Sequence, residues 1–95
     1  MERIEPKYKR ILLKLSGEAL AADCDGILNF DFITRVGEVL KKCLEKDVQI
    51  GIIVGAGNIW RGRQGGKMNR VRADQMGMLA TVINSLALAD TFIEM

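Results

Sequence analysis

The sequence predicts an α/β domain with a parallel sheet, on the basis of three segments. Two short apolar runs, residues 8–15 and 48–54, are typical of β-strands, and the second is rich in β-branched residues. Between them, residues 31–46 repeat apolar side chains every three or four positions, as a helix with one buried face does. Strand, helix and strand in this order form a βαβ unit, whose crossover is expected to be right-handed.

The first strand and the helix have recognisable ends. The first run, YKRILLKL, places three apolar residues side by side, which predicts a strand buried on both faces, and Ser16-Gly17 ends it. Residues 18–29 predict a loop with a short turn of helix. Asp31 is the predicted N-cap of the helix, and lysines in its last turns suit the negative end of the helix dipole.

Residues 73–93 predict a second helix that is apolar on most sides. One side is expected to carry Met76, Leu79, Ala80, Ile83, Leu86 and Ala87. Such a helix must be buried in a core or an interface. A parallel pair of strands also needs cover on both faces and neighbours at its edges, so we expect partner strands, from further sequence or another chain, to complete the sheet.

Composition restricts the class of protein. The net charge of +2 is too small to imply a nucleic-acid or membrane partner by itself. There is no histidine, and Cys24 and Cys43 make no metal-ligand spacing. No signal peptide is recognisable and the apolar stretches are short for a membrane span, so the chain is expected to be cytoplasmic with reduced thiols. Residues 61–72 hold five basic residues and no acidic one, which predicts affinity for an anion.

Glycine follows both predicted strands, at the edge of the sheet where α/β proteins bind ligands. The first turn contains Ser16-Gly17 and the second reads Gly-Ala-Gly-Asn at residues 55–58. Glycine there lets backbone N–H groups approach a phosphate. Lys14 would add a positive charge, Ser16 a hydroxyl and Arg61 a guanidinium suited to bidentate phosphate contact. Asp74 would suit the two hydroxyls of a ribose.

Two common phosphate motifs are excluded. The dinucleotide pattern G-x-G-x-x-G fails because Trp60 stands at the third glycine position. The Walker A pattern fails because Met68 follows Gly66-Lys67 where serine or threonine is required. Each glycine turn alone is most often a plain turn. The prediction of a phosphate site therefore rests on both turns and the basic segment meeting at one sheet edge.

Three motifs resemble bacterial UMP kinases (uridylate kinases), which are members of the amino acid kinase family. They are YKRILLKLSGEAL at 8–20, GAGNIWRG at 55–62, and MNR leading into ADQMGMLATVIN at 68–84. The first motif is shared with relatives that act on acetylglutamate, aspartate or carbamate, and the third points to the UMP branch.

The resemblance implies a three-layer α/β/α fold with a mostly parallel central sheet. Residues 1–95 would be the N-terminal portion of a single amino acid kinase domain whose C-terminal nucleotide-binding part is absent. The implied reaction moves the γ-phosphate of ATP, with Mg²⁺, to UMP, giving UDP and ADP in pyrimidine nucleotide synthesis. The resemblance also implies a cytoplasmic homohexamer activated by GTP and inhibited by UTP, although residues 21–27 lack the usual glycine-rich pattern linked to GTP.

The resemblance also assigns roles to residues. Lys14 and Arg61 would be catalytic. Asp74 would bind UMP, as would Ala56, which stands where the family usually has a glycine and whose methyl is tolerated if its φ is negative. The residues implied in ATP binding are Lys14, Leu15, Ser16, Gly17, Gly57 and Arg61.

Other interpretations stay open at this point. The chain could be a catalytically incomplete fragment that acts at most as a nucleotide-binding module. The basic segment 61–72 could instead bind RNA, although no aromatic residue beyond Trp60 accompanies its charges.

Overall fold

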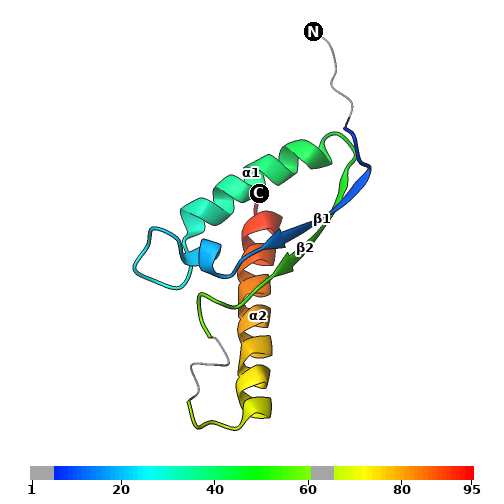
Figure 1. Cartoon of the computed structure of the whole chain (residues 1–95). Helices are drawn as coiled ribbons and strands as arrows, with labels where there is room; N and C mark the ends of the chain where they lie inside the picture. Colours follow the sequence, from blue (N-terminus) through cyan, green and yellow to red (C-terminus); the bar gives the residue numbers. More distant parts are fainter. Residues whose placement is uncertain (1–5, 61–65) are drawn as a thin grey trace.

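The computed structural model describes residues 6–60 and 66–95. Its elements follow the predicted order of strand, short helical turn, helix, strand and helix (Figure 1). They are β1 (Arg10–Leu15), the 3₁₀ turn η1 (Glu18–Ala21), α1 (Phe30–Leu44), β2 (Gln49–Val54) and α2 (Arg70–Ile93).

The two strands pair in parallel, in a register that runs from Arg10 opposite Gln49 to Leu15 opposite Val54. Alternate residues of both strands are partly or fully buried, so one face of the sheet points into the core. Both helices contribute to that core, which is built around Leu20, Ile33, Val54 and Leu88. The helices also meet each other, because Gly37 of α1 packs against Phe92 near the end of α2.

The prediction that the first strand is buried on both faces is wrong for the described part of the chain, and the second strand is likewise exposed on one face. Leu12 in β1 is 68% exposed and Ile53 in β2 is 51% exposed. Because α1 and α2 pack on the same side of the sheet, no described element covers the other side. The described chain therefore contains the sheet and one helical layer of an α/β/α arrangement, and Lys14 lies on the uncovered face.

Helix α1 starts at Phe30, because Asn29 rather than the predicted Asp31 is its N-cap. The side-chain oxygen of Asn29 accepts a hydrogen bond from the backbone N–H of Phe32 at 3.1 Å. At the other end the chain turns through Asp47, which has a φ of +61°. The N–H of Val48 then bonds the carbonyl of Cys43, in the 6→1 pattern of a Schellman motif, and leads directly into β2.

Helix α2 starts at Arg70, three residues before the predicted start, because Asn69 caps it. On the side expected to carry Met76, Leu79, Ile83 and Leu86, these four side chains are exposed. The buried positions are Ala73, Ala80, Asn84 and Leu88. The small residues Ala73 and Ala80 let this part of the helix approach the loop before it closely.

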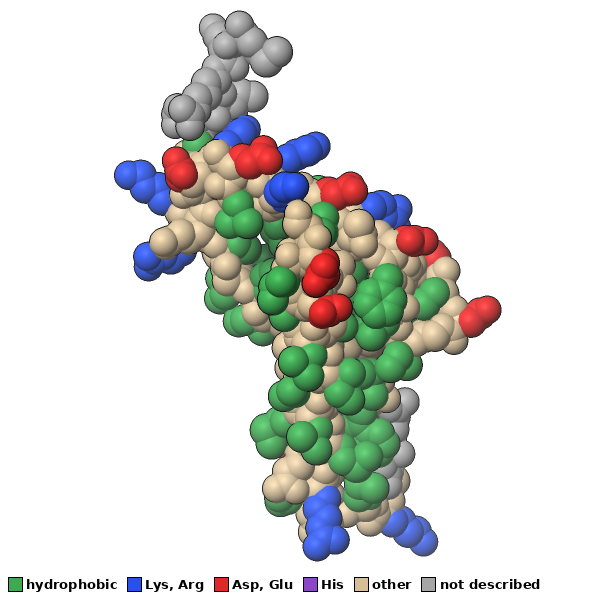
Figure 2. All heavy atoms as spheres, turned by 180° about the vertical axis from the view of Figure 1, so that it is seen from behind, with side chains coloured by type: hydrophobic (Ala, Val, Ile, Leu, Met, Phe, Trp, Pro, Cys, Tyr) green, Lys and Arg blue, Asp and Glu red, His purple; other side chains and the backbone are tan. Residues whose placement is uncertain are grey.

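The remaining surface of α2 is unusually apolar. Figure 2 shows hydrophobic side chains along its length, and Leu79 and Leu86 are each 65% exposed. Of the described elements, α2 is also long and apolar enough to cross a membrane by length and composition. This is weak support for a membrane location, because the core helix of a globular protein meets the same criterion.

Candidate functional site

The two glycine turns predicted from the sequence lie against each other at the carboxyl ends of β1 and β2. A Cβ placed on Gly17 would lie 2.9 Å from the backbone N of Ala56 and closer still to the N of Gly57. Gly17 is itself buried. The backbones are therefore in direct contact, which confirms the expectation that both turns share one edge of the sheet.

The first turn places Lys14, Leu15 and Ser16 in different environments. Lys14 is exposed on the uncovered face of β1. The backbone carbonyl of Leu15 accepts a hydrogen bond from Gly55 N–H at 3.0 Å, which ties the first turn to the second. The Ser16 hydroxyl oxygen accepts from Ala19 N–H at 3.1 Å, while the hydroxyl proton can still be donated.

The second turn accommodates alanine at position 56 without backbone strain. Among the described residues other than glycine, positive φ occurs at Asp23 and Asp47, so Ala56 has the negative φ that its methyl requires. The Ala56 carbonyl accepts hydrogen bonds from the N–H groups of Ile59 and Trp60, both at 2.9 Å. The turn is thus closed on itself, and it leaves the edge of the sheet toward the N-terminus of α2.

Two asparagines join this turn to α2, and neither is among the predicted site residues. Asn84 is fully buried and donates to the Gly55 carbonyl at 2.8 Å and to the Asn58 side-chain oxygen at 2.7 Å. Asn58 donates back to Asn84 at 3.1 Å and also to the Ile27 carbonyl at 2.6 Å. Asn84 could have been selected from the sequence, because it is an asparagine inside an otherwise apolar helix.

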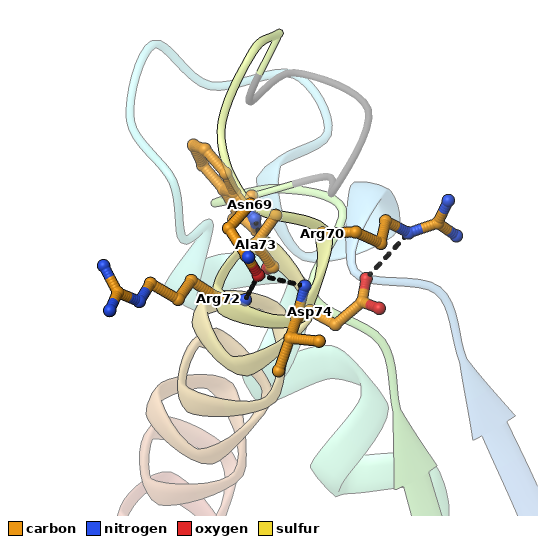
Figure 3. Close-up of polar contacts among 7 residues, drawn as sticks. Asn69, Arg70, Arg72, Ala73 and Asp74 are labelled. Carbon is orange, nitrogen blue, oxygen red and sulfur yellow. Dashed lines mark hydrogen bonds and ion pairs between the residues drawn. The ribbon is translucent and has the colours of Figure 1, made fainter.

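Asp74, the residue predicted to bind ribose, follows the first turn of α2 (Figure 3). The Asn69 side chain accepts from the N–H groups of Val71 and Arg72, and Arg70 pairs with Asp74 at 3.4 Å. This ion pair is exposed and contributes little to stability. Asp74 precedes Asn84 by ten residues, about 15 Å along a helix axis. The structure therefore does not bring Asp74 into contact with the paired glycine turns.

The remaining predicted residue, Arg61, lies outside the described residues, as does the basic segment as far as residue 65. Trp60 is described, and its indole N–H donates to the Ala73 carbonyl at 2.8 Å. Trp60 therefore lies beside the first turn of α2. Lys67, Arg70 and Arg72, which are the described basic residues of this part of the chain, are exposed.

Within residues 6–60 and 66–95, no group of three or more His, Cys, Asp or Glu side chains is placed to hold a metal ion. A cavity of about 380 Å³ lies at the other end of the molecule, between α1, β2 and the end of α2. Its lining is almost entirely apolar, with Leu40, Ile52 and Phe92 among the contacts. This cavity is a packing surface rather than a site for a charged ligand.

A parallel βαβ unit with apposed glycine turns at its strand ends is typical of α/β proteins that bind phosphate groups or nucleotides. The family model described as "Amino acid kinase family" matches residues 9–95. The chain therefore belongs to the amino acid kinase family.

Two solved structures of larger proteins are similar to this chain. A UMP kinase from Bacillus anthracis matches with 35% sequence identity and a TM-score of 0.82, over 92% of this chain and 36% of that chain. A UMP kinase from Ureaplasma parvum matches with 37% identity and a TM-score of 0.81, over 95% of this chain and 39% of that one. The chain thus spans little more than a third of the length of either relative. These matches support an N-terminal UMP kinase fragment with the fold of those enzymes.

Proposed function

We propose that the protein takes part in transfer of the γ-phosphate of ATP to UMP, giving UDP and ADP. The observation that carries the proposal is the contact between the two glycine turns, through Gly17 and the Ala56–Gly57 backbone, in a chain whose relatives include UMP kinases. We further propose a cytoplasmic role in pyrimidine nucleotide synthesis, with Mg²⁺ held mainly by the phosphates of ATP, because Mg²⁺ is commonly bound through substrate phosphates.

The chemistry needs positioning and charge more than it needs a base. The second pKa of a phosphate monoester is about 6, so the attacking phosphate of UMP is already mostly ionised at neutral pH. Lys14, at the end of β1, and Arg61 are the cations proposed to stabilise the moving phosphoryl group. Leu15, Ser16, Gly17 and Gly57 are proposed to contact ATP, and Ala56 and Asp74 to contact UMP.

The substrate is tested by measuring ADP formation from ATP by the chain, with UMP, CMP, acetylglutamate and carbamate offered separately. We expect ADP formation with UMP and none above background with the other three. Turnover with acetylglutamate or carbamate instead would contradict the assignment to UMP while leaving the family unchanged.

A second candidate function is nucleotide binding without phosphate transfer. The observation that favours it is the contact between the two glycine turns, since binding a phosphate through backbone N–H groups requires no transfer of the phosphate. Calorimetric titration with UMP distinguishes the two candidates. Binding without ADP formation supports the binding module, and the absence of both binding and turnover contradicts both candidates.

We also propose that the chain forms a homo-oligomer, a hexamer by resemblance to the family, through the exposed side of α2, with GTP and UTP as effectors. Burying one leucine side chain contributes about 1.5–3 kcal/mol. Leu86→Lys is therefore expected to raise the dissociation constant of self-association at least about tenfold in sedimentation velocity experiments. Gln75→Lys, on the same helix but polar and exposed, is the matched control. Unchanged sedimentation of the Leu86→Lys variant would contradict the proposed interface.

A further inference from the structure

The fully buried Asn84 is in an unusual position for a polar side chain. Its neighbours along the buried stripe of α2 are Ala80 and Leu88. A buried amide without partners destabilises a fold, so its hydrogen bonds must all be formed. They are: among the described residues, no buried side-chain nitrogen or oxygen lacks a partner.

The two asparagine amides form a closed and oriented pair. The carbonyls of Gly55 and Ile27 can only accept, so each must face an amide nitrogen. This fixes which way both amides point, and leaves the oxygen of Asn84 to accept from Asn58 and the oxygen of Asn58 to accept from Asn84. Rotating either amide by 180° would bring two oxygens together.

The pair also determines the orientation of one peptide plane in the second glycine turn. Cis peptide bonds do not occur among the described residues, so the Ala56 N–H points opposite to the Gly55 carbonyl. Asn84 holds that carbonyl toward α2, and the Ala56 N–H therefore points away from α2. The backbone nitrogens of Ala56 and Gly57 lie against Gly17 of the first turn.

These N–H groups have no hydrogen-bond partner in the described part of the chain. Within residues 6–60 and 66–95, neither Ala56 N–H nor Gly57 N–H donates a hydrogen bond. Successive backbone N–H groups directed to one side form a site for an anion. Resting on the function proposed above, we propose that Asn84 is a positioning residue, which orients the Gly55–Ala56 peptide so that the N–H group of Ala56 can donate to the phosphate of UMP and the N–H group of Gly57 to a phosphate of ATP.

Two isosteric variants separate positioning from stability. Asn84→Asp replaces the donor that holds the Gly55 carbonyl with an oxygen. Asn58→Asp removes the donors to Ile27 and Asn84, yet it keeps an oxygen that accepts from Asn84, so the bond from Asn84 to Gly55 remains. Both variants are expected to lower stability. We expect only Asn84→Asp to weaken UMP binding strongly, by roughly ten- to hundredfold.

The test combines UMP titration with amide N–H residual dipolar couplings of Ala56 and Gly57 in the ligand-free chain. For Asn84→Asp we expect couplings that no longer fit the structure, and for Asn58→Asp couplings close to those of the unmutated chain. Ser85→Ala, which removes an exposed hydroxyl bonded to Thr81 on the same helix, is the neutral control. Asn84→Ser removes the same donor without adding a charge and replaces Asn84→Asp if that variant does not fold.

The outcomes are distinct. Couplings that stay unchanged in Asn84→Asp or Asn84→Ser would overturn the inference, as would equal losses of UMP affinity in the variants at positions 84 and 58. If the unmutated chain does not bind UMP, the proposed function fails, and the dipolar couplings still decide whether Asn84 orients the peptide.

Discussion

Replacing Gly17 with alanine is expected to separate the two glycine turns and to destabilise the chain by about 1–3 kcal/mol, as overpacked cores do. The backbone of Gly17, with φ −59° and ψ −34°, is in a region that any residue adopts, so strain in the backbone is not the cause. The cause is space. The new Cβ would meet the backbone of Ala56 and Gly57, which cannot move aside as a flexible side chain can.

Thermal unfolding measures this effect, since each kcal/mol shifts the midpoint of a domain of this size by about 4–8 °C. UMP affinity should fall in the same variant, because the N–H groups of Ala56 and Gly57 move with the second turn. Gly26→Ala is the matched control: a Cβ at Gly26 has nothing within 4 Å, so its unfolding midpoint should stay within a degree or two of the original. Similar midpoints for both variants would show that the turns are not in close contact.

The order of elements was predictable because hydrophobic periodicity distinguishes the strands from α1. The helix boundaries were harder to predict, because several residues near the start of each helix can act as an N-cap. Asn29 and Asn69 cap α1 and α2 through side-chain oxygens that reach N–H groups of the first turn. Asp31 has the right chemistry but lies two residues too late, inside the first turn of the helix.

The buried side of α2 could not be predicted from its pattern, because a helix that is apolar on most sides has no preferred side. The buried side of α2 is the side with the smallest side chains rather than the most hydrophobic ones. Ala73, Gly77 and Ala80 let the helix lie close to Trp60 and the second turn, whereas Leu79 and Leu86 would hold it further away.

The part of the site formed by residues next to the strand ends was predictable from the sequence. Glycine after each strand, together with parallel pairing, was enough to place Gly17 beside Gly57 at one edge. The bonds of Asn84 to Gly55 and Asn58 link positions 29 and 26 residues apart, respectively. No local pattern predicts such contacts, since they depend on how α2 packs after the chain has turned.

Replacing Lys14 with methionine is expected to have the largest effect on catalysis. Lys14 is exposed near the end of β1, opposite Ile53, and forms no ion pair with any described residue. Its charge is therefore available to a ligand at the neighbouring turns. Methionine keeps most of the apolar stem and removes the charge, so the strand should remain intact.

We expect Lys14→Met to lower the rate of ADP formation with saturating ATP and UMP by about 10²–10³-fold, the range found when one preorganised donor to a transition state is lost. UMP affinity should change by no more than a few-fold, because the charge acts mainly on the phosphoryl group in transit. Lys9→Met is the control, since Lys9 is also exposed but precedes β1, at the opposite end of the strand pair. Equal losses in turnover and in UMP affinity would assign Lys14 to ground-state binding, and an unchanged rate would remove it from the site.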